Sequence, residues 1–314
     1  MKILFTSVGR RVELMQAFRY AAERLEMPLE IYGVDITDTA PALRFCDHTV
    51  IVPRIKDAAY IPTLQKVCKE ESIAALIPTI DTDLLLLSRH KFDFRETKVV
   101  INNTDKIALC RDKRFTADYF HSIGLYSPSP VDDWTKYDGG FPAFIKPKDG
   151  SSSIFAYKVN SYEELKSYAA KVPDYIIQPF IDGTEYTVDI FCDFDGNPIF
   201  ITPRIRQAVR AGEVLKTEIR QDEKIIYEMK RLVADYRPCG QITVQLIRQE
   251  STGDDYYIEI NPRFGGGAPL SIKAGADSAE MLLRLLNGEK IGYVDGAAED
   301  GAVYSRFDQS VRVK

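Results

Sequence analysis

Three polar side chains occupy alternate positions at the end of a short apolar segment late in the chain. Glu259, Asn261 and Arg263 are two residues apart, so they would share one face of an extended strand. Ile258 and Ile260 would then point the other way. A carboxylate beside an amide oxygen suits a hard cation such as Mg²⁺, and a guanidinium suits a phosphate or acyl-phosphate. Taken alone, the pattern is equally consistent with a solvated strand end.

Composition narrows the class of protein. The chain has 314 residues, of which 45% are hydrophobic and 28% charged, an ordinary balance for two or three globular domains. The formal net charge of -5 argues against nucleic acid as a partner but allows a local basic pocket for a nucleotide. Five scattered cysteines without a CxxC pair favour a reducing compartment, so we expect a cytoplasmic protein without disulfides or a zinc site.

Two further classes are disfavoured. The three histidines show no ligand spacing, which argues against a histidine metal site or a Ser-His-Asp triad. The opening residues, MKILFTSVGRR, form a short apolar run followed by an arginine pair, unlike a signal peptide. No apolar run approaches ~20 residues, so neither a membrane span nor a membrane partner is expected.

Residues 1–105 alternate between apolar strands and amphipathic segments. This alternation predicts a doubly wound parallel sheet, which would bind ligands at the carboxyl ends of its strands. The candidate pocket residues at those ends are Ser7, Gly9, Arg10, Asp35, Thr79, Asp81 and Asp83.

Each of these residues also has a purely structural interpretation. For Ser7, Thr79 and the nearby Asp38, a helix cap or turn is the preferred one. The Arg10–Arg11 pair is evenly balanced between a solvated helix start and an anion contact. Because this turn has one glycine and lacks the G-x-G-x-x-G pattern, an NAD-type oxidoreductase is disfavoured.

A small α+β unit is expected over residues 106–182, with linker helices first and a lid beginning at about 130. Its strand at 141–147 carries Lys146 near its end, and a polar Gly/Ser loop follows. The backbone N–H groups of such a loop, with a neighbouring lysine, can bind phosphates. By itself, the loop favours an ordinary hairpin.

Residues 183–314 are predicted to form a larger sheet, with a possible edge strand at 304–313. Gln245 lies on the strand before the one that carries Glu259 and is expected within its reach. Arg206, Arg210 and Lys216 bracket a turn and are candidates for binding a substrate carboxylate, which a guanidinium can bind bidentately. A basic loop facing solvent is an equally acceptable interpretation.

Several motifs in one order carry a resemblance to a known superfamily. They are Phe141–Pro147, Gln178–Glu185, Gln245 and Ile258–Arg263. From Lys113 to Ala274 the chain resembles the ATP-grasp superfamily, closest to the branch of the carbamoyl phosphate synthase large subunit, and residues 1–105 look like its pre-ATP-grasp domain. The resemblance implies an α/β plus α+β architecture: a doubly wound parallel sheet followed by a two-lobed ATP-grasp domain.

The resemblance also implies roles for individual residues. The nucleotide would be bound by Lys113, Lys146, Ser151, Ser152, Gln178, Phe180, Ile181 and Glu185: lysines and loop on the phosphates, the 178–181 segment on adenine, and Glu185 on the ribose. Glu259, Asn261 and Gln245 would hold the metal, and Arg263, Lys146 and Arg206 would act in catalysis. Relatives often have an acid where Gln178 stands, although an amide can still accept from an amino group. Many relatives also have an acid where Gln245 stands, which leaves open whether one or two metal ions bind.

The implied activity is a carboxylate–amine ligase that uses ATP and Mg²⁺, or Mn²⁺, and forms an acyl-phosphate and ADP. Its partners would be a small carboxylate and an amine, and a homodimer is a general expectation. A whole carbamoyl phosphate synthase has two such halves and this chain has one, which favours a stand-alone ligase. The main alternative is a catalytically silent, ATP-binding regulatory subunit.

Overall fold

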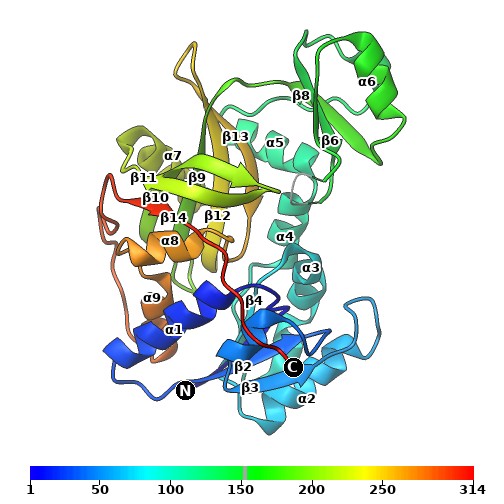
Figure 1. Ribbon diagram of the computed structural model, residues 1–314. Helices are drawn as coiled ribbons and strands as arrows, with labels where there is room; N and C mark the ends of the chain where they lie inside the picture. The colour runs from blue at the N-terminus through cyan, green and yellow to red at the C-terminus, as the bar shows by residue number, and fades with distance from the viewer. Residues whose placement is uncertain (151–153) are drawn as a thin grey trace.

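The amino-terminal part of the chain forms the first of three sheets. The structure is a computed structural model that describes residues 1–150 and 154–314 (Figure 1). A five-stranded parallel sheet has the order β3-β2-β1-β4-β5, so the strand order reverses between β1 and β4. Its strands are β1 (Lys2–Thr6), β2 (Glu30–Asp35), β3 (His48–Ile51), β4 (Ala75–Pro78) and β5 (Lys98–Val99). Its helices are α1 (Val12–Arg24), α2 (Tyr60–Glu70) and α3 (Asp81–His90), with short 3-10 turns at Pro41–Phe45 and Lys91–Phe94.

Both faces of this sheet are buried, as its apolar strands predict. Phe5 of β1 faces the core that contains α1, whereas its neighbour Leu4 faces the core of α2 and α3. The predicted doubly wound parallel sheet is therefore confirmed.

A small antiparallel sheet forms a separate lobe at the upper right of Figure 1. Its strands β6 (Ala143–Pro147), β7 (Tyr157–Val159) and β8 (Tyr175–Pro179) have the order β7-β6-β8 and are covered by α6 (Tyr162–Ala169). A 3-10 turn, Trp134–Lys136, precedes them. Ile145, Leu165 and Ile177 belong to a core of this lobe alone.

A six-stranded antiparallel sheet makes the body of the second half, in the order β13-β12-β9-β10-β11-β14. Its strands are β9 (Gly183–Cys192), β10 (Pro198–Arg210), β11 (Glu213–Ile219), β12 (Gly240–Gln249), β13 (Asp255–Asn261) and β14 (Val303–Ser305). Helix α7 (Glu223–Tyr236) covers one face, and α8 (Ala268–Lys273) and α9 (Ser278–Leu286) lie toward the other. Two linker helices, α4 (Thr104–Arg111) and α5 (Lys113–Ser122), precede the small lobe, and Phe120 of α5 packs on Tyr257 of β13 with ring centroids 5.4 Å apart.

One core joins the first sheet to the large sheet. Phe5 of β1, Phe18 of α1 and Phe264 just beyond β13 form a chain of edge-on aromatic contacts, with centroids 5.0 and 5.9 Å apart. Ala268 and Leu282, from α8 and α9, belong to the same core. The turns at the carboxyl ends of β1 and β4 are therefore held close to the end of β13.

A β-bulge changes the expected geometry of β13. Glu259 pairs with Gln245, but the next pair on β12 is Leu246 with Tyr257, so Ile258 is an extra residue. As a result Tyr257 and Ile260 both enter the core while Ile258 does not. The expectation that Ile258 and Ile260 share a face is wrong, because strict alternation stops at the bulge.

The end of the chain also departs from expectation. The predicted edge strand at 304–313 is reduced to β14, and the chain then continues without strand structure toward the first sheet (Figure 1). There the Lys314 amine lies 3.1 Å from a carboxylate oxygen of Asp38, and Arg44 donates to the carbonyl of Val313. Polar contacts with the first sheet therefore take the place of the expected strand pairing.

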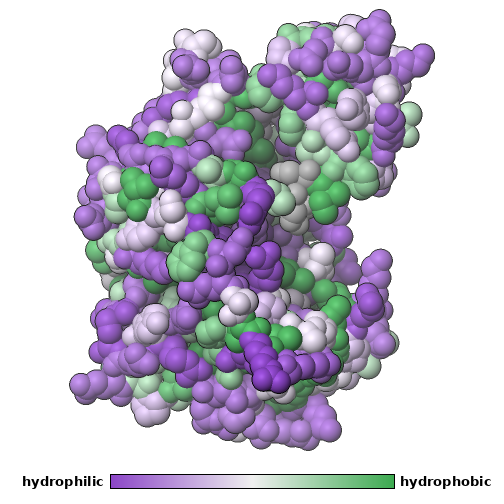
Figure 2. Space-filling model, viewed as in Figure 1, coloured by the Kyte–Doolittle hydropathy of each residue, from purple (hydrophilic) through white to green (hydrophobic). Residues whose placement is uncertain are grey.

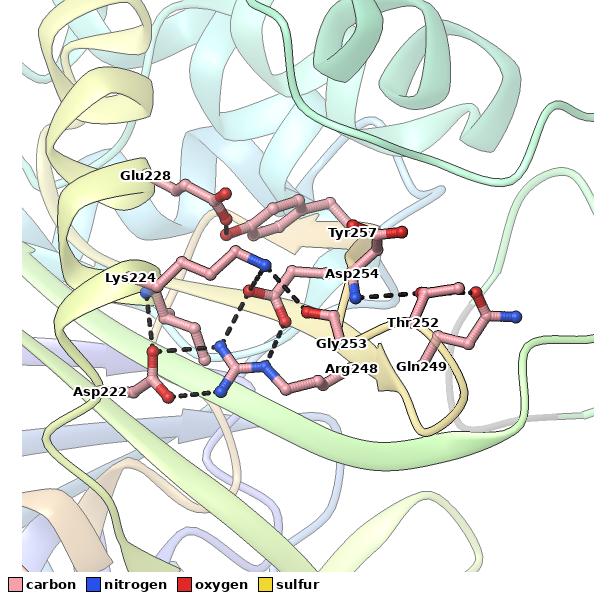
Figure 3. Close-up of polar contacts among 11 residues, drawn as sticks. Asp222, Lys224, Glu228, Arg248, Gln249, Thr252, Gly253, Asp254 and Tyr257 are labelled. Atoms are coloured by element: carbon pink, nitrogen blue, oxygen red, sulfur yellow. Dashed lines mark hydrogen bonds and ion pairs between the residues drawn. The ribbon is translucent and has the colours of Figure 1, made fainter.

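An ionic cluster fastens the start of β13 to α7 (Figure 3). Arg248 of β12 donates to the buried Asp255 at 2.7 Å and to Asp222, the residue that caps α7, at 3.0 Å. Lys224 lies 3.1 Å from Asp255, and the Tyr257 hydroxyl donates to Glu228 of α7 at 2.6 Å. The strand that carries Glu259 is thus anchored at its beginning, away from its polar end.

Within residues 1–150 and 154–314, none of the helices has both the length and the apolar character needed to cross a membrane.

Replacing Arg248 with methionine should destabilise the fold. Among the described residues, the substitution leaves Asp222 without its ion pair and the buried Asp255 with only Lys224. We expect the free energy of unfolding to fall by about 3 kcal/mol, because a stranded buried charge is costly. Urea unfolding followed by circular dichroism measures this loss.

The matched control is Arg220→Met, which removes an exposed pair with Glu218 and should cost less than about 1 kcal/mol. Equal losses in the two variants would contradict the anchoring role of Arg248.

Candidate functional site

A cleft separates the small lobe from the rest of the molecule, and Figure 2 shows the surface hollowed there. A pocket beside it is lined by residues from α3, the α4–α5 junction, the loop after β6 and the end of β13. Of the predicted site and pocket residues, those that line this pocket together are Asp81, Lys113, Glu259 and Asn261. The predicted loop residues Ser151 and Ser152 lie outside the described residues.

The two lysines come from different elements: Lys113 begins α5, a helix that packs on β13, and Lys146 lies on β6 of the small lobe. The Lys113 amine donates to the Gly150 carbonyl at 2.8 Å, and its backbone N–H donates to the Lys148 carbonyl. Lys146, on β6, is almost fully buried. Burial, and then the charge of Lys113, lower the pKa of Lys146 to about 8, while Glu259 opposes the shift. The structure thus brings both predicted lysines and Glu259 into one electrostatic unit.

The polar end of β13 forms a short chain of hydrogen bonds. The Asn261 amide donates to Glu259 at 2.9 Å, and its oxygen accepts from Arg263 at 3.2 Å. A cation bound by both Glu259 and Asn261 would need the Asn261 oxygen turned toward Glu259, which replaces this bond. One carboxylate and one amide oxygen fit Mg²⁺, provided that phosphates and water complete its six ligands.

Gln245 is engaged by a different partner. It lies opposite Glu259 in the sheet, and its side-chain oxygen accepts from Arg206 at 2.8 Å. Arg206 also lies 3.6 Å from Glu185 and donates to the Gly212 carbonyl at 3.0 Å. Burial lowers the pKa of Arg206, and Glu185 opposes this shift. The structure therefore joins Arg206, Gln245 and Glu185 beside the acidic strand.

The other two candidates for a substrate carboxylate are more exposed than Arg206. Arg210 is exposed near the β10–β11 turn and pairs with Asp308 at 3.2 Å. Lys216 is exposed on β11. Its neighbour Thr217 is the partner of Arg206 in the sheet, so the backbone of Lys216 lies near Arg206 although its side chain is exposed.

The predicted adenine segment joins the small lobe to the large sheet. The Gln178 amide is buried and donates to the Pro128 carbonyl, and the Phe180 N–H donates to the Pro142 carbonyl at 3.1 Å. The Phe180 ring lies under the Lys158 amine, 3.9 Å from its centroid. Ile181 is half-buried beyond them. The side chain of Gln178 and the backbone N–H of Phe180 therefore stabilise the linker through hydrogen bonds.

The first sheet also contributes charged side chains close to the end of β13. Asp81, a predicted pocket residue, pairs with Arg263 at 2.6 Å, and Arg11 donates to the Thr79 carbonyl at 3.2 Å. The buried Asp83 accepts from three hydroxyl groups, and burial raises its pKa to about 6. The signal that could have favoured Arg11 is its position directly after β1, at the reversal of strand order.

Comparison with known proteins assigns the family. A family model described as an ATP-grasp domain matches residues 110–267, about half of the chain. The chain belongs to the ATP-grasp family. A second model, described as a PylC-like N-terminal domain, matches residues 3–101 of this ATP-grasp protein.

Two relatives illustrate the sequence similarity. The N-terminal section of the carbamoyl phosphate synthase large chain of Aquifex aeolicus is 24% identical over 319 residues, covering 90% of this chain and 56% of that protein. The 3-methyl-D-ornithine–L-lysine ligase of Methanosarcina mazei is 25% identical over 191 residues, covering 60% and 48%. The ATP-grasp chain thus spans about half the length of these relatives.

Solved structures support the same fold. The biotin carboxylase domain of Hydrogenobacter thermophilus 2-oxoglutarate carboxylase, in complex with MgADP, ADP and bicarbonate, aligns with a TM-score of 0.77 at 16% identity. The alignment covers 96% of this chain and 73% of that one. An L-amino acid ligase from Bacillus licheniformis aligns with a TM-score of 0.71 at 18% identity, covering 91% and 74%. The predicted ATP-grasp architecture is therefore confirmed.

The lowered pKa of Lys146 predicts a pH dependence for nucleotide binding. The protonated amine attracts a triphosphate, so Mg-ATP affinity should be greatest below pH 8 and fall as pH rises above it, by up to about tenfold per unit. In Lys146→Gln the affinity should be weaker at neutral pH and lack this decline. Isothermal titration from about pH 7 to about pH 9 tests both effects.

The exposed Lys166→Gln, also in the small lobe, is the control and should behave as wild type. A decline that persists in Lys146→Gln would show that another group is responsible.

Proposed function

We propose that this ATP-grasp protein is an ADP-forming ligase that activates a carboxylate with Mg-ATP and joins it to an amine. The observation that carries the proposal is the convergence of three segments: Lys113 at the start of α5 lines one pocket with Glu259 and Asn261 of β13, and the charges of Lys113 and Glu259 both act on the buried Lys146 of the small lobe. A buried lysine facing a carboxylate and an amide is suited to a Mg²⁺-bound triphosphate.

The proposed reaction has two steps. A carboxylate oxygen of the acceptor attacks the γ-phosphorus of ATP, and the bond to the β,γ-bridging oxygen breaks, giving an acyl-phosphate and ADP. The amine then attacks the acyl carbon, the bond from that carbon to the phosphate oxygen breaks, and the amine loses a proton as the amide forms. The first step depends mainly on position and charge neutralisation.

Particular side chains suit the first step. Lys146 and Lys113 would bind phosphate oxygens, while Arg263, at the end of β13, would neutralise charge on the transferred group. Arg206 is held by Gln245 and Glu185, so it would present its charge in a fixed orientation. When bound, Mg²⁺ at Glu259 and Asn261 would supply further charge neutralisation. Gln245 would act on this site indirectly, by orienting Arg206. Its side-chain oxygen would become free for a metal ion only if the hydrogen bond from Arg206 opened.

Glu259→Gln tests the metal assignment. The substitution keeps the shape of the side chain and removes its charge, so carboxylate-dependent ADP release should fall at least ~100-fold. The measurement is coupled-assay ADP production with Mg-ATP, amine and carboxylate pools. Glu250→Gln, on an exposed position after β12, is the matched control and should keep wild-type turnover.

Undiminished ADP release by Glu259→Gln would refute the assignment. Tight Mg-ATP binding by the wild type without turnover across a broad acid pool would instead favour the regulatory subunit.

A further inference from the structure

Arg11 occupies a distinctive place in the fold. It lies in the turn after β1 and immediately before α1, beside the reversal of strand order between β1 and β4. Crevices at such points, outside the carboxyl ends of parallel strands, are where doubly wound sheets bind ligands. Arg11 thus faces the junction between the first sheet and the end of β13.

The turn that carries Arg11 is held in one conformation. Ser7 and Gly9 have positive φ angles of 52° and 46°. The Ser7 hydroxyl donates to Asp83, and the Gly9 N–H donates to Asp35 at 2.9 Å. Thr79 donates to the Ser7 carbonyl at 2.9 Å, which ties this turn to the end of β4. Arg11 therefore projects from a preorganised turn.

Arg11 differs from two neighbouring arginines in its ion pairing. Arg263 has Asp81 as its ion-pair partner, and Arg306 has Glu13 and Glu213 at 3.0 and 3.5 Å. Among residues 1–150 and 154–314, Arg11 has no carboxylate within 4.0 Å, and its side chain donates to the Thr79 carbonyl.

Two observations point to an anion beside Arg11. Burial and the nearby charge of Arg263 lower the pKa of Arg11, so two guanidinium groups act on one another in a poorly solvated place. The Nε of Arg263 is buried and has no hydrogen-bond partner among the described residues. Arginine stays charged, and a desolvated cation without a counter-ion is costly, so a ligand anion would stabilise Arg11 and could also accept from the Nε of Arg263.

We propose that Arg11 is a specificity-determining residue that binds the carboxylate of the acceptor, together with Arg263, at the reversal of strand order. This assignment rests on the proposed ligase function. In this assignment Arg11 of the first sheet binds the acceptor, in place of the exposed Arg210 and Lys216 expected from the sequence. Asp81 and Glu213 also act on Arg11, so a singly charged carboxylate fits the site better than a doubly charged phosphate.

The experiment compares wild-type protein with Arg11→Gln, Arg11→Lys and Arg10→Gln. Arg10 is the adjacent arginine and its side chain is exposed, so it is the matched control. Thermal unfolding is followed in the full chain with Mg-ATP, at constant ionic strength, during titration with acetate, lactate, alanine, succinate and inorganic phosphate. Sodium chloride corrects for general salt effects.

A carboxylate should raise the melting temperature of the wild type and of Arg10→Gln at the same concentration. Arg11→Gln should need at least ~10-fold more, because a charge-assisted bidentate contact is lost. Arg11→Lys should lie between them, since a lysine keeps the charge without the planar fork. Affinity for Mg-ATP should be the same in all four proteins.

Three results would overturn the assignment: equal carboxylate binding by Arg11→Gln and wild type, binding of phosphate in preference to every carboxylate, or no carboxylate binding by the wild type. The proposed ligase function is judged separately. If Mg-ATP fails to bind the wild type while a carboxylate binds through Arg11, the ligase proposal fails and the anion site stands.

Discussion

The central constraint in this molecule is the placement of a buried cation, Lys146, opposite the carboxylate of Glu259. Burial and Lys113 both disfavour the charge on Lys146, so the small lobe alone provides a poor environment for it. The acidic strand of the large sheet compensates only in part. A polyanion lying between the lysines and the acidic strand would offset the unfavourable positive charge of Lys146 beside Lys113. The cleft is therefore suited to a metal-bound triphosphate.

The rest of the structure places these charges. The ionic cluster around Arg248 anchors the start of β13, and the bulge at Ile258 sets the face on which its polar end emerges. The aromatic contacts of Phe5, Phe18 and Phe264 then bring the first sheet to the residue after Arg263. The geometry of the proposed site therefore depends on contacts formed by segments far apart in sequence.

The sequence predicted the parts of this arrangement that follow from local pattern. Alternating strands and helices identified the parallel sheet, and the spacing of Glu259, Asn261 and Arg263 suggested the polar strand end. The bulge escaped prediction because an extra residue leaves no mark in an alternating pattern until the partner strand is known. The separation of Arg210 from Arg206 has a similar cause: proximity in sequence does not determine where a long, irregular hairpin directs each side chain.

The feature that the sequence predicted least well was the set of polar partners of each buried side chain. Whether Arg11 has a counter-ion depends on Asp81, Glu213 and Arg306, which come from three separate segments. The same limitation applies to Gln178, whose partner Pro128 lies fifty residues earlier in the chain. Sequence alone could nominate these side chains but could not show which of their polar groups are already satisfied.

The small lobe has a hydrophobic core of its own, whereas the first sheet shares one with α8 and α9. Swinging the small lobe away would leave its core intact, but detaching the first sheet would expose Phe18 and Phe264 to water. The free energy of opening is therefore lowest when the small lobe moves alone. Nucleotide could then enter and leave while Arg11, Asp81 and Arg263 keep their mutual arrangement.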